Sequence, residues 1–474
     1  MSPRAAALAL LAAGLTACAV GPNYVKPEAP VAPSFSAAAA DVYSPGDVPQ
    51  QYWTQFADPT LDQLIADALE ANHDLRIALS RLTEARALYH EREFDLAPTV
   101  TASGGYTKER FSQLQSPTGQ ALTESFYDAG FDAFWELDFF GRVRRQVQSG
   151  HAQVQAAQAS LRDAQVSVTG ELARTYFELR GQQLELAVAR RNVENQGETL
   201  EITRARLEAG RGTEFDTARA QAQLSGTLAT IPPLEAAIAR SIHRLAVLTG
   251  RAPDALDARL ASARELPPLP ALSAIGDPAG LLRRRPDIRV AERQLAAATA
   301  DVGVAIADYF PHVTFTGNYT YTAAEIGAFG QSPTVGYLIG PRISWAAFDL
   351  GRVHARVSGS RAREAGALAG YEQSVLRALE ETEDALVTHA RTRQSLTDAE
   401  AAARSSRTAA QIARERYEGG VADFLDVLDA ERTQLAAEDS LAQSRTAAAT
   451  SLVALYKALG GGWEMAPSPR SAAR

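Results

Sequence analysis

The feature that most constrains the fold of this chain is an internal repeat that fills most of its length. The segment RLEAGRGTEFDTARA (206–220) aligns with RYEGGVADFLDVLDA (416–430) at an offset of 210 residues. Further matches, at this offset or at one of 213 residues, pair Trp135 with Trp345, Pro98 with Pro311, and Leu75 with Ile288. Two copies of one structural unit should therefore fold in similar ways. We expect one copy at 61–270 and the second at 271–460, followed by a C-terminal tail at 461–474.

Four segments alternate between apolar and polar residues with a period of two, which is typical of β-strands. In SFYDAGFDAFWELD (125–138) the odd positions from Tyr127 to Leu137 are apolar, and the even positions include Asp and Glu. The same pattern runs through TVTASGGY (99–106), HVTFTGNYTYT (312–322) and TVGYLIGPRISW (334–345). We expect a bulge or irregularity in the last strand, because Pro341 has no amide hydrogen to donate.

The length and the aromatic residues of these strands indicate a lipid-facing sheet. Strands of about ten residues, with one apolar face and Tyr or Trp near their ends, are typical of membrane barrels. Four strands are too few to close such a barrel, since the smallest ones use about eight. The sequence therefore predicts that several chains contribute strands to one barrel.

Long helices are expected in the rest of the chain, because proline is absent from 118–231 and from 342–466. The segments 141–209 and 350–419 would each form a helix roughly 100 Å long. Apolar residues recur every seven positions in the first of these, as in a coiled coil, with one eleven-residue step near its middle. The prolines of IPPLEAA (231–237) should break or kink the shorter helical segment that contains them, 214–250. Shorter helical segments are expected at 61–97, 214–250, 286–310 and 423–459.

The N-terminal part of the sequence predicts secretion and lipid attachment. A positive charge and the apolar run AAALALLAAGLTA precede Cys18, which is the single cysteine of the chain. LTAC (15–18) resembles the bacterial lipobox, so we expect a signal peptide at 1–17 and a lipid-anchored tether at 18–60. Because Ala19 rather than Asp follows the cysteine, the resemblance implies sorting to the outer membrane. A single cysteine allows no disulfide within the chain.

Composition and motif spacing exclude several classes of function. The formal net charge of -9 argues against a nucleic-acid-binding protein, which would need a basic face. The seven histidines are scattered without metal-ligand spacing, and GRG (210–212) lacks the context of a phosphate loop. We therefore expect no enzymatic activity, no cofactor and no structural metal.

Five features in the right order resemble the outer membrane efflux protein family. They are the lipobox, the segment AVGPNYVKP directly after it, LLRRRPDIRVAE (281–292), FDLGR (348–352) and FLDVLDAERTQL (424–435). Within that family the chain is similar to NodT-type lipoproteins related to TolC. The resemblance implies a mainly helical fold with a small β part, in which a homotrimer shares one twelve-stranded outer-membrane barrel and a coiled-coil α-helical barrel.

The same resemblance implies the function and the partners of this chain. It predicts the exit duct of a tripartite efflux pump, which passively conducts small molecules to the outside. The expected partners are two further copies of the chain, a periplasmic adaptor protein, an inner-membrane transporter of the RND type, and outer-membrane lipid. No nucleic acid is expected.

The turns at the ends of the two long helices are expected to be hairpin tips. Gly210 and Gly420 lie where each helix must end with a positive φ. Thr213 and Asp423 are suited to cap the returning helices, and capping is the favoured role of Asp423. The resemblance implies that the tips contact the adaptor through Gly210, Gly212, Thr213, Gly420, Val421 and Asp423.

The resemblance also implies a gate at the periplasmic entrance of the channel. Asp426 and Asp429 are three residues apart on one helical face and match the aspartates that ring this entrance in TolC-like proteins. Such a ring would select cations or bind a stray divalent ion. Tyr417 matches a tyrosine of the same network, whereas Ala422 stands where the family has an arginine. Closure should therefore depend more on apolar packing, by Phe424 and Leu425.

Two other classes of protein fit parts of the sequence. A lipid-anchored periplasmic coiled-coil adaptor would explain the heptads, but it should lack aromatic, lipid-facing strands. A self-assembling adhesin or structural spacer would need no acidic ring at a helical turn.

Overall fold

A computed structural model of the chain describes residues 19–29, 31–39, 41–44, 46–114, 119–270 and 273–463. The chain divides into two compact units, each assembled from three separate stretches of sequence. The first unit comprises Met1–Glu28, Ser80–Gln158 and Arg289–Gln373. The second comprises Ala29–Leu79, Ala159–Ile288 and Ser374–Arg474.

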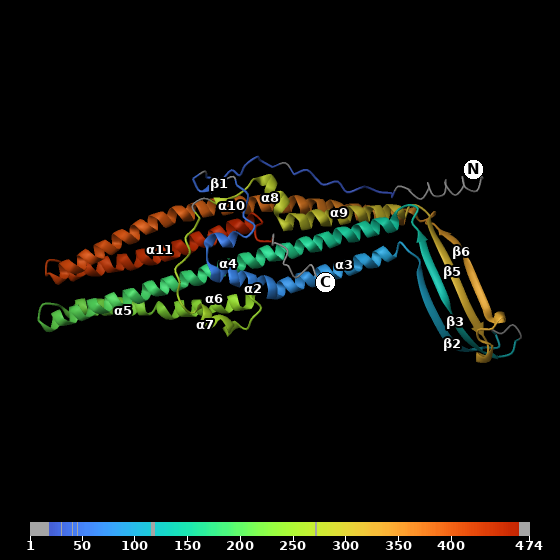
Figure 1. Ribbon diagram of the computed structural model, residues 1–474, viewed down its shortest axis with the longest axis horizontal. Coiled ribbons are helices and arrows are strands. Elements are labelled where there is room, and N and C mark those ends of the chain that lie inside the picture. The colour runs from blue at the N-terminus through green and yellow to red at the C-terminus, as the bar shows by residue number, and fades with distance from the viewer. Residues whose placement is uncertain are drawn as a thin grey trace. The chain divides into compact units, whose positions relative to one another are not determined.

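The first unit contains an antiparallel sheet of four strands in the order β2-β3-β5-β6 (Figure 1). These strands are β2 (Thr99–Phe111), β3 (Leu122–Leu137), β5 (His312–Ala323) and β6 (Val335–Ser344), at the positions that the alternation predicts. The register pairs Trp135 with Phe315, and Tyr319 with both Phe131 and Tyr337. Since side chains alternate along a strand, this register places the apolar positions of neighbouring strands on one face.

The expectation of an irregularity at Pro341 is wrong. Pro341 pairs with Phe315, and the register from His312–Ser344 to Tyr321–Val335 continues without a slip on either side of it. The reason is the position of β6, which is the last strand of the sheet. An edge strand tolerates proline because a missing amide hydrogen on its outer side removes no bond of the ladder.

One long helix follows the two strands in each half of the chain, as predicted. The two helices are α4 (Arg142–Glu208) and α10 (Leu350–Glu418), and their bounds agree with the expected ones to within one residue at each end. Each helix contributes its first part to the first unit and the rest to the second. The first unit also contains most of α9 (Pro286–Ala307) and of α3 (His73–Phe94), and the short turns η3 (Ile326–Ala328) and η4 (Ser332–Thr334).

Among the described residues of the second unit, the regular structure is helical apart from one two-stranded parallel pairing of β1 (Tyr43–Ser44) with β4 (Ser273–Ala274). Its principal helices are α2 (Pro59–Ala71), α5 (Glu214–Leu228), α6 (Ile231–Leu248), α8 (Pro278–Arg284) and α11 (Phe424–Ala458). Shorter elements are η1 (Tyr52–Phe56), η2 (Pro253–Leu256) and α7 (Asp257–Leu260).

The main hydrophobic core of the second unit joins segments from both ends of the chain. Tyr52, from the predicted N-terminal tether, stacks on Tyr456 of α11 at 5.1 Å between ring centroids. Phe56 packs against Phe177 of α4 at 4.7 Å. All four rings are buried, so the part of the tether around η1 belongs to the folded core.

Two of the shorter helical segments are interrupted. The segment 61–97 was expected to be helical throughout, but Asn72 separates α2 from α3. The Asn72 amide donates to the Leu248 carbonyl at 2.9 Å, and its oxygen accepts from the Asp74 amide at 2.8 Å. The segment 214–250 breaks after Leu228, as the prolines predict. The proline at the start of α6 is tolerated because first-turn amides have no intrahelical partner.

The two halves of the chain therefore repeat one order of elements, with helix, two strands, long helix, tip and returning helix. None of the described helices contains a stretch apolar enough to cross a membrane.

Candidate functional site

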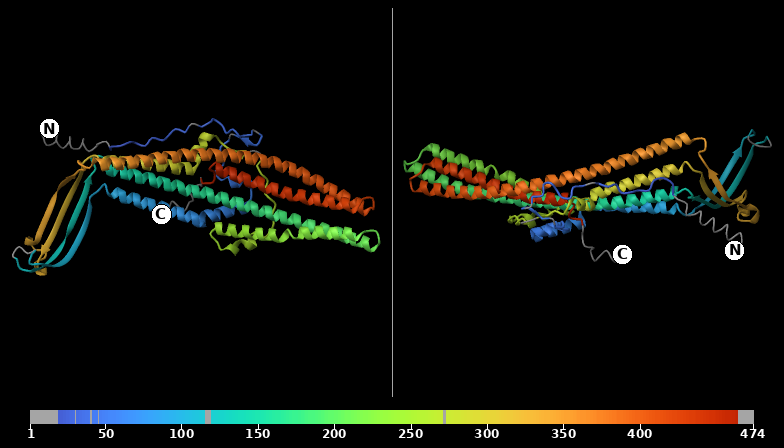
Figure 2. Two further views of the ribbon diagram at one scale, coloured as in Figure 1. Left: turned by 180° about the vertical axis from the view of Figure 1, so that it is seen from behind. Right: turned by 90° about the horizontal axis from the view of Figure 1, so that it is seen from above.

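The candidate site lies in the second unit, where the two helical hairpins end. The α4–α5 tip and the α10–α11 tip lie side by side in every view (Figures 1 and 2). Gly210 and Gly420 have φ values of 69° and 76°, as the sequence predicts for residues that end a helix. The amide of Arg211 donates to the Arg206 carbonyl at 2.8 Å, and the equivalent bond joins Val421 to Arg416 at 2.9 Å. The two tips are therefore built in the same way.

Both returning helices begin with a cap. The Thr213 hydroxyl accepts from the Asp216 amide at 3.2 Å, and the Thr213 amide donates to the Asp216 carboxylate at 3.2 Å. In the second tip the Asp423 amide donates to the Asp426 carboxylate at 3.3 Å. Reciprocal bonds of this kind satisfy amides that the first turn leaves unpaired. Asp423 and Thr213 thus occupy the cap positions expected of them, and Asp426 has a structural contact of its own.

An aromatic pair and an arginine join the two tips. Tyr417 and Phe424 are both buried, with ring centroids 5.8 Å apart. The guanidinium of Arg206 lies 3.9 Å from the centroid of the Tyr417 ring and donates to the Tyr417 carbonyl. Burial raises the pKa of the Tyr417 hydroxyl, and the charge of Arg206 opposes that rise. The pair packs with Leu200, Ala220, Val427 and Leu428.

The remaining residues of the expected gate are exposed in the single chain. Leu425 is 46% exposed and does not join the buried cluster around Phe424. Asp426 and Asp429 are exposed as well, and so is Val421, which belongs to the expected adaptor-contacting surface. Gly212, another residue of that surface, does not have the positive φ that Gly210 has. The expected lipidation site, Cys18, lies outside the described residues.

A buried ion-pair seam, formed by Glu431 and Glu438 with their partners, continues from the tips along the hairpins. Glu431 accepts from the Thr199 hydroxyl at 2.7 Å and from Arg414 at 2.9 Å. Glu438 accepts twice from Arg407, at 3.0 and 2.8 Å. Both glutamates are buried, so removing one partner would leave a charge without compensation. The sequence signal for this seam is a seven-residue spacing. The two glutamates are seven residues apart on one helix and the two arginines are seven residues apart on the other, so each set lies on one face of its helix and the two faces can meet.

Sequence reasoning also missed Arg206. It aligns with Arg416 in the repeat, but the repeat does not indicate that one of the two arginines contacts an aromatic ring and the other stays exposed. The partner of Arg206 lies 211 residues away along the chain, beyond the reach of local patterns.

A groove of about 990 Å³ lies between α4, α5, α6 and α11. Glu185 and Asp439 line it, and burial raises the pKa of both carboxyl groups; the neighbouring Asp439 charge raises that of Glu185 further. A cation in the groove would be stabilised by these groups, whereas Arg219 and Arg432 on the same walls would oppose it. Among the described residues, no three His, Cys, Asp or Glu side chains are placed to hold a metal ion.

Comparison with known proteins gives long matches. The model of the family described as outer membrane efflux protein matches residues 64–251 and 278–461. Nodulation protein T of Rhizobium leguminosarum bv. trifolii is 31% identical over 452 residues, which cover 95% of each chain. The probable efflux pump outer membrane protein TtgC of Pseudomonas putida is 32% identical over 466 residues, covering 96% of this chain and 95% of the relative. The solved structure of the outer-membrane channel OprN aligns with a TM-score of 0.88 and 44% identity, over 94% of this chain and all of the OprN chain.

Proposed function

This chain belongs to the outer membrane efflux protein family, and from that premise we propose that it is the outer membrane channel of an efflux pump. The observation that carries the proposal is the full-length likeness to a solved outer-membrane channel at 44% identity. The chain also has the parts that such a channel needs. Its sheet has one apolar face suited to lipid, and its two long hairpins can line a conduit.

The proposed working form is a homotrimer. The two outer strands of the sheet, β2 and β6, are each paired on one side within the described chain. Unpaired strand edges are unfavourable in lipid, because no water is present to satisfy their amides and carbonyls. Pairing of β2 with β6 of a neighbouring copy would remove these edges, with one amide donor missing at Pro341, and three copies would give twelve strands. Native mass spectrometry of the detergent-purified protein measures the number of copies directly.

The proposed partners are a periplasmic adaptor and, through it, an inner-membrane transporter. The exposed tips of the two hairpins, including Val421, are the surface that we assign to the adaptor. The channel has no energy source of its own, so transport would be driven by the transporter. An adaptor or spacer role is less favoured, since neither accounts for the apolar face of the sheet.

The proposed gate combines a buried contact and a set of exposed carboxylates. The Tyr417–Phe424 pair and Arg206 hold the two tips of one chain together. Asp426 and Asp429, from each of three chains, would line the entrance and favour cations. Leu425, exposed in the single chain, would contribute contacts between chains.

The proposed N-terminal processing removes 1–17 as a signal peptide and attaches lipid to Cys18. The segment 18–60 would then be the anchored tether, and 461–474 a tail outside the two repeats. Mass spectrometry of the protein purified from membranes would detect the added acyl chains. A Cys18→Ser variant should lose that mass.

Conductance in planar lipid bilayers tests the proposed function. The purified protein should insert as a channel that prefers cations, and Asp426→Ala with Asp429→Ala should weaken that preference. A purified, trimeric protein that produces no conductance would contradict the proposal.

A further inference from the structure

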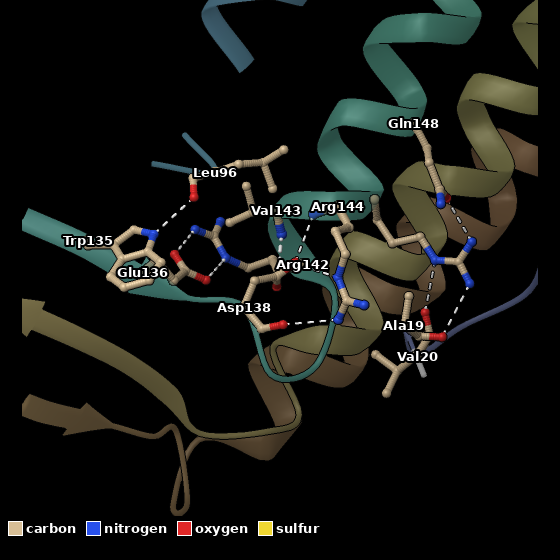
Figure 3. Close-up of polar contacts among 11 residues, drawn as sticks. Ala19, Val20, Leu96, Trp135, Glu136, Asp138, Arg142, Val143, Arg144 and Gln148 are labelled. Atoms are coloured by element: carbon tan, nitrogen blue, oxygen red, sulfur yellow. Dashed lines mark hydrogen bonds and ion pairs between the residues drawn. The ribbon is translucent and has the colours of Figure 1, made fainter. Parts of the chain in front are cut away.

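A buried arginine makes most of the side-chain hydrogen bonds to the segment that follows Cys18. Arg145, in the first turn of α4, is 3% exposed. Its guanidinium donates to the Val20 carbonyl at 3.1 Å, to the Gly21 carbonyl at 3.2 Å and to the Asn23 side-chain oxygen at 2.9 Å. A longer bond of 3.4 Å reaches the Ala19 carbonyl. Figure 3 shows the carbonyl groups of Ala19 and Val20 meeting this guanidinium beside Gln148.

The backbone of the same segment is bonded to the connection between β3 and α4. The Val20 amide donates to the Phe140 carbonyl at 3.0 Å. That connection is itself ordered by polar contacts, because Asp138 accepts from the amides of Val143 and Arg144 at 3.2 and 2.9 Å (Figure 3). The segment therefore rests on the point where the sheet ends and the long helix begins.

Three glycines make room for this close approach. A Cβ atom on Gly141, whose φ is 83°, would lie 2.5 Å from the Ala19 side chain. A Cβ on Gly21 would lie 2.5 Å from the Gly303 backbone, and one on Gly303 would lie 2.9 Å from the Arg145 side chain. Contacts this short require a shift, so larger residues at these positions would displace either the segment or Arg145. The segment, α4 and α9 can therefore approach this closely only because these three positions carry no side chain.

The chemistry of the contact makes the segment and Arg145 depend on each other. The partners of the guanidinium are carbonyl and amide oxygens, including that of Gln148 at 2.9 Å, and none of the recorded bonds is to a carboxylate. The segment supplies four of the five oxygens that accept from this guanidinium, so it provides most of the hydrogen bonds that compensate the buried charge. Because three of these acceptors are main-chain carbonyls, the site recognises the path of the backbone and requires few particular side chains.

We propose that Arg145, Gly141 and Gly303 form a clamp that seats residues 19–23 against the sheet-to-helix connection, and that Arg145 is thereby a positioning residue for the lipid anchor. This inference rests on the proposed acylation of Cys18. Ala19 follows Cys18 directly in the sequence, so the clamp would restrain the residue next to the proposed acylation site. The clamp binds a segment of this same chain. We assign to the clamp the role of keeping the lipid anchor near the strands while they insert into the membrane.

Further contacts extend the same docking along α9. The Tyr24 hydroxyl donates to Glu292 at 3.1 Å, and the Lys26 amine lies 3.8 Å from the same carboxylate. Arg293 lies over the Tyr24 ring at 5.2 Å. These contacts extend beyond the clamp, but they involve more exposed side chains. The clamp should therefore contribute most of the free energy that holds the segment in place.

Hydrogen exchange of the full-length membrane-extracted protein tests the docking. Arg145→Ala should accelerate exchange in the peptide that contains Val20 at least tenfold. Arg142→Ala is the matched control, because Arg142 lies in the same turn of α4 and its guanidinium donates to Glu136. Gly303→Ala serves as a second variant that should preserve the helix, since alanine favours helix more than glycine does. Unchanged exchange at Val20 in both Arg145→Ala and Gly303→Ala would overturn the clamp.

A double-variant cycle with Cys18→Ser separates positioning of the lipid from a general structural role. The readout is the amount of protease-resistant protein in the outer membrane, and acylation is checked by mass. Arg145→Ala should lower this amount several-fold in the acylated chain and cause little further loss in the Cys18→Ser chain. An equal loss in both backgrounds, or a Cys18→Ser chain that assembles as well as the unaltered one, would refute the positioning role. Neither readout uses conductance, so a failure of the proposed channel function would be seen separately.

Discussion

The guanidinium of Arg206 lies 3.9 Å from the ring centroid of Tyr417, and this contact joins the α4–α5 hairpin to the α10–α11 hairpin. The same side chain donates to the Tyr417 carbonyl, so the ring and the backbone of the second hairpin are both held by the first. The family resemblance indicated an arginine at the position of Ala422. In this chain Arg206, from the first repeat, reaches the α10–α11 tip and supplies its cationic partner.

Arg206→Ala should loosen the contact between the two tips. A cation–π contact that is partly desolvated contributes about 1 to 2 kcal/mol, and the carbonyl bond is lost with it. We expect the closed entrance to become less stable, which would appear as more frequent or larger openings in planar bilayers. Arg416→Ala is the matched control, since Arg416 is the equivalent residue of the second repeat and is exposed. Equal effects of the two substitutions would contradict this role of Arg206.

Asp426 should have two separable effects, because it lies in a cap and also belongs to the proposed acidic ring. Asp426→Ala and Asp216→Ala should each weaken the first turn of their helix by about 1 kcal/mol, seen as faster hydrogen exchange there. Asp429→Ala should not weaken the turn to the same extent. The reversal potential in a KCl gradient should change for Asp426→Ala and Asp429→Ala only. A similar change for Asp216→Ala would show that selectivity responds to loss of the cap.

The parts of the fold that follow local patterns could be predicted from the sequence. Alternation located all four strands, and proline-free heptads located α4 and α10, because both signals lie within one element. Local propensity failed at Pro341, where the position of β6 at the sheet edge decides the outcome. It failed again at Asn72, whose partner Leu248 is 176 residues away. The clamp at Arg145 has no sequence signal, since its acceptors are backbone carbonyls.

In the candidate site, too, features set by adjacent residues could be predicted, whereas contacts between distant segments could not. The glycines and caps of the tips were predictable, because each depends on a few adjacent residues. The contact of Arg206 with Tyr417 and the seam of Glu431 and Glu438 depend on which helices face each other. A single sequence gives the heptad positions of these residues but does not identify the helices that they face.

Gln196→Leu should stabilise the second unit. Gln196 is 2% exposed, and neither its amide nitrogen nor its oxygen has a hydrogen-bond partner among the described residues. Burying unsatisfied polar atoms costs about 1 to 3 kcal/mol, whereas leucine has a similar size and no polar atoms. We expect a higher urea midpoint for loss of the helical circular dichroism signal. Gln158→Leu, at an exposed position of the same helix, should leave the midpoint nearly unchanged. A lower midpoint for Gln196→Leu would indicate that the amide has a partner in the assembled protein.

His389 should make the second unit less stable in acid. Its ring is fully buried, with Nδ1 3.1 Å from the Ser451 hydroxyl and no partner for Nε2 among the described residues. Burial, and to a lesser extent the charge of Arg393, lower the pKa of His389 from 6.5 to about 4. The unfolded chain therefore binds more protons than the folded chain between these two values. Stability should fall as the pH is lowered from about 6.5 to about 4, by roughly 3 kcal/mol in total.

The comparison that isolates His389 is the pH dependence of a His389→Gln variant. Other buried groups also titrate in acid, but they are common to both proteins and cancel in the difference. Tyr43, whose ring lies 6.1 Å away, stays neutral in this range, because a tyrosine ordinarily titrates near pH 10 and burial raises the pKa of Tyr43 further, to about 12. The variant should lose less stability than the unaltered chain between pH 6.5 and pH 4, measured by urea unfolding. His243→Gln, at an exposed position, should behave like the unaltered chain. If His389→Gln and the unaltered chain lose stability in parallel, the neutral, desolvated state assigned to His389 is wrong.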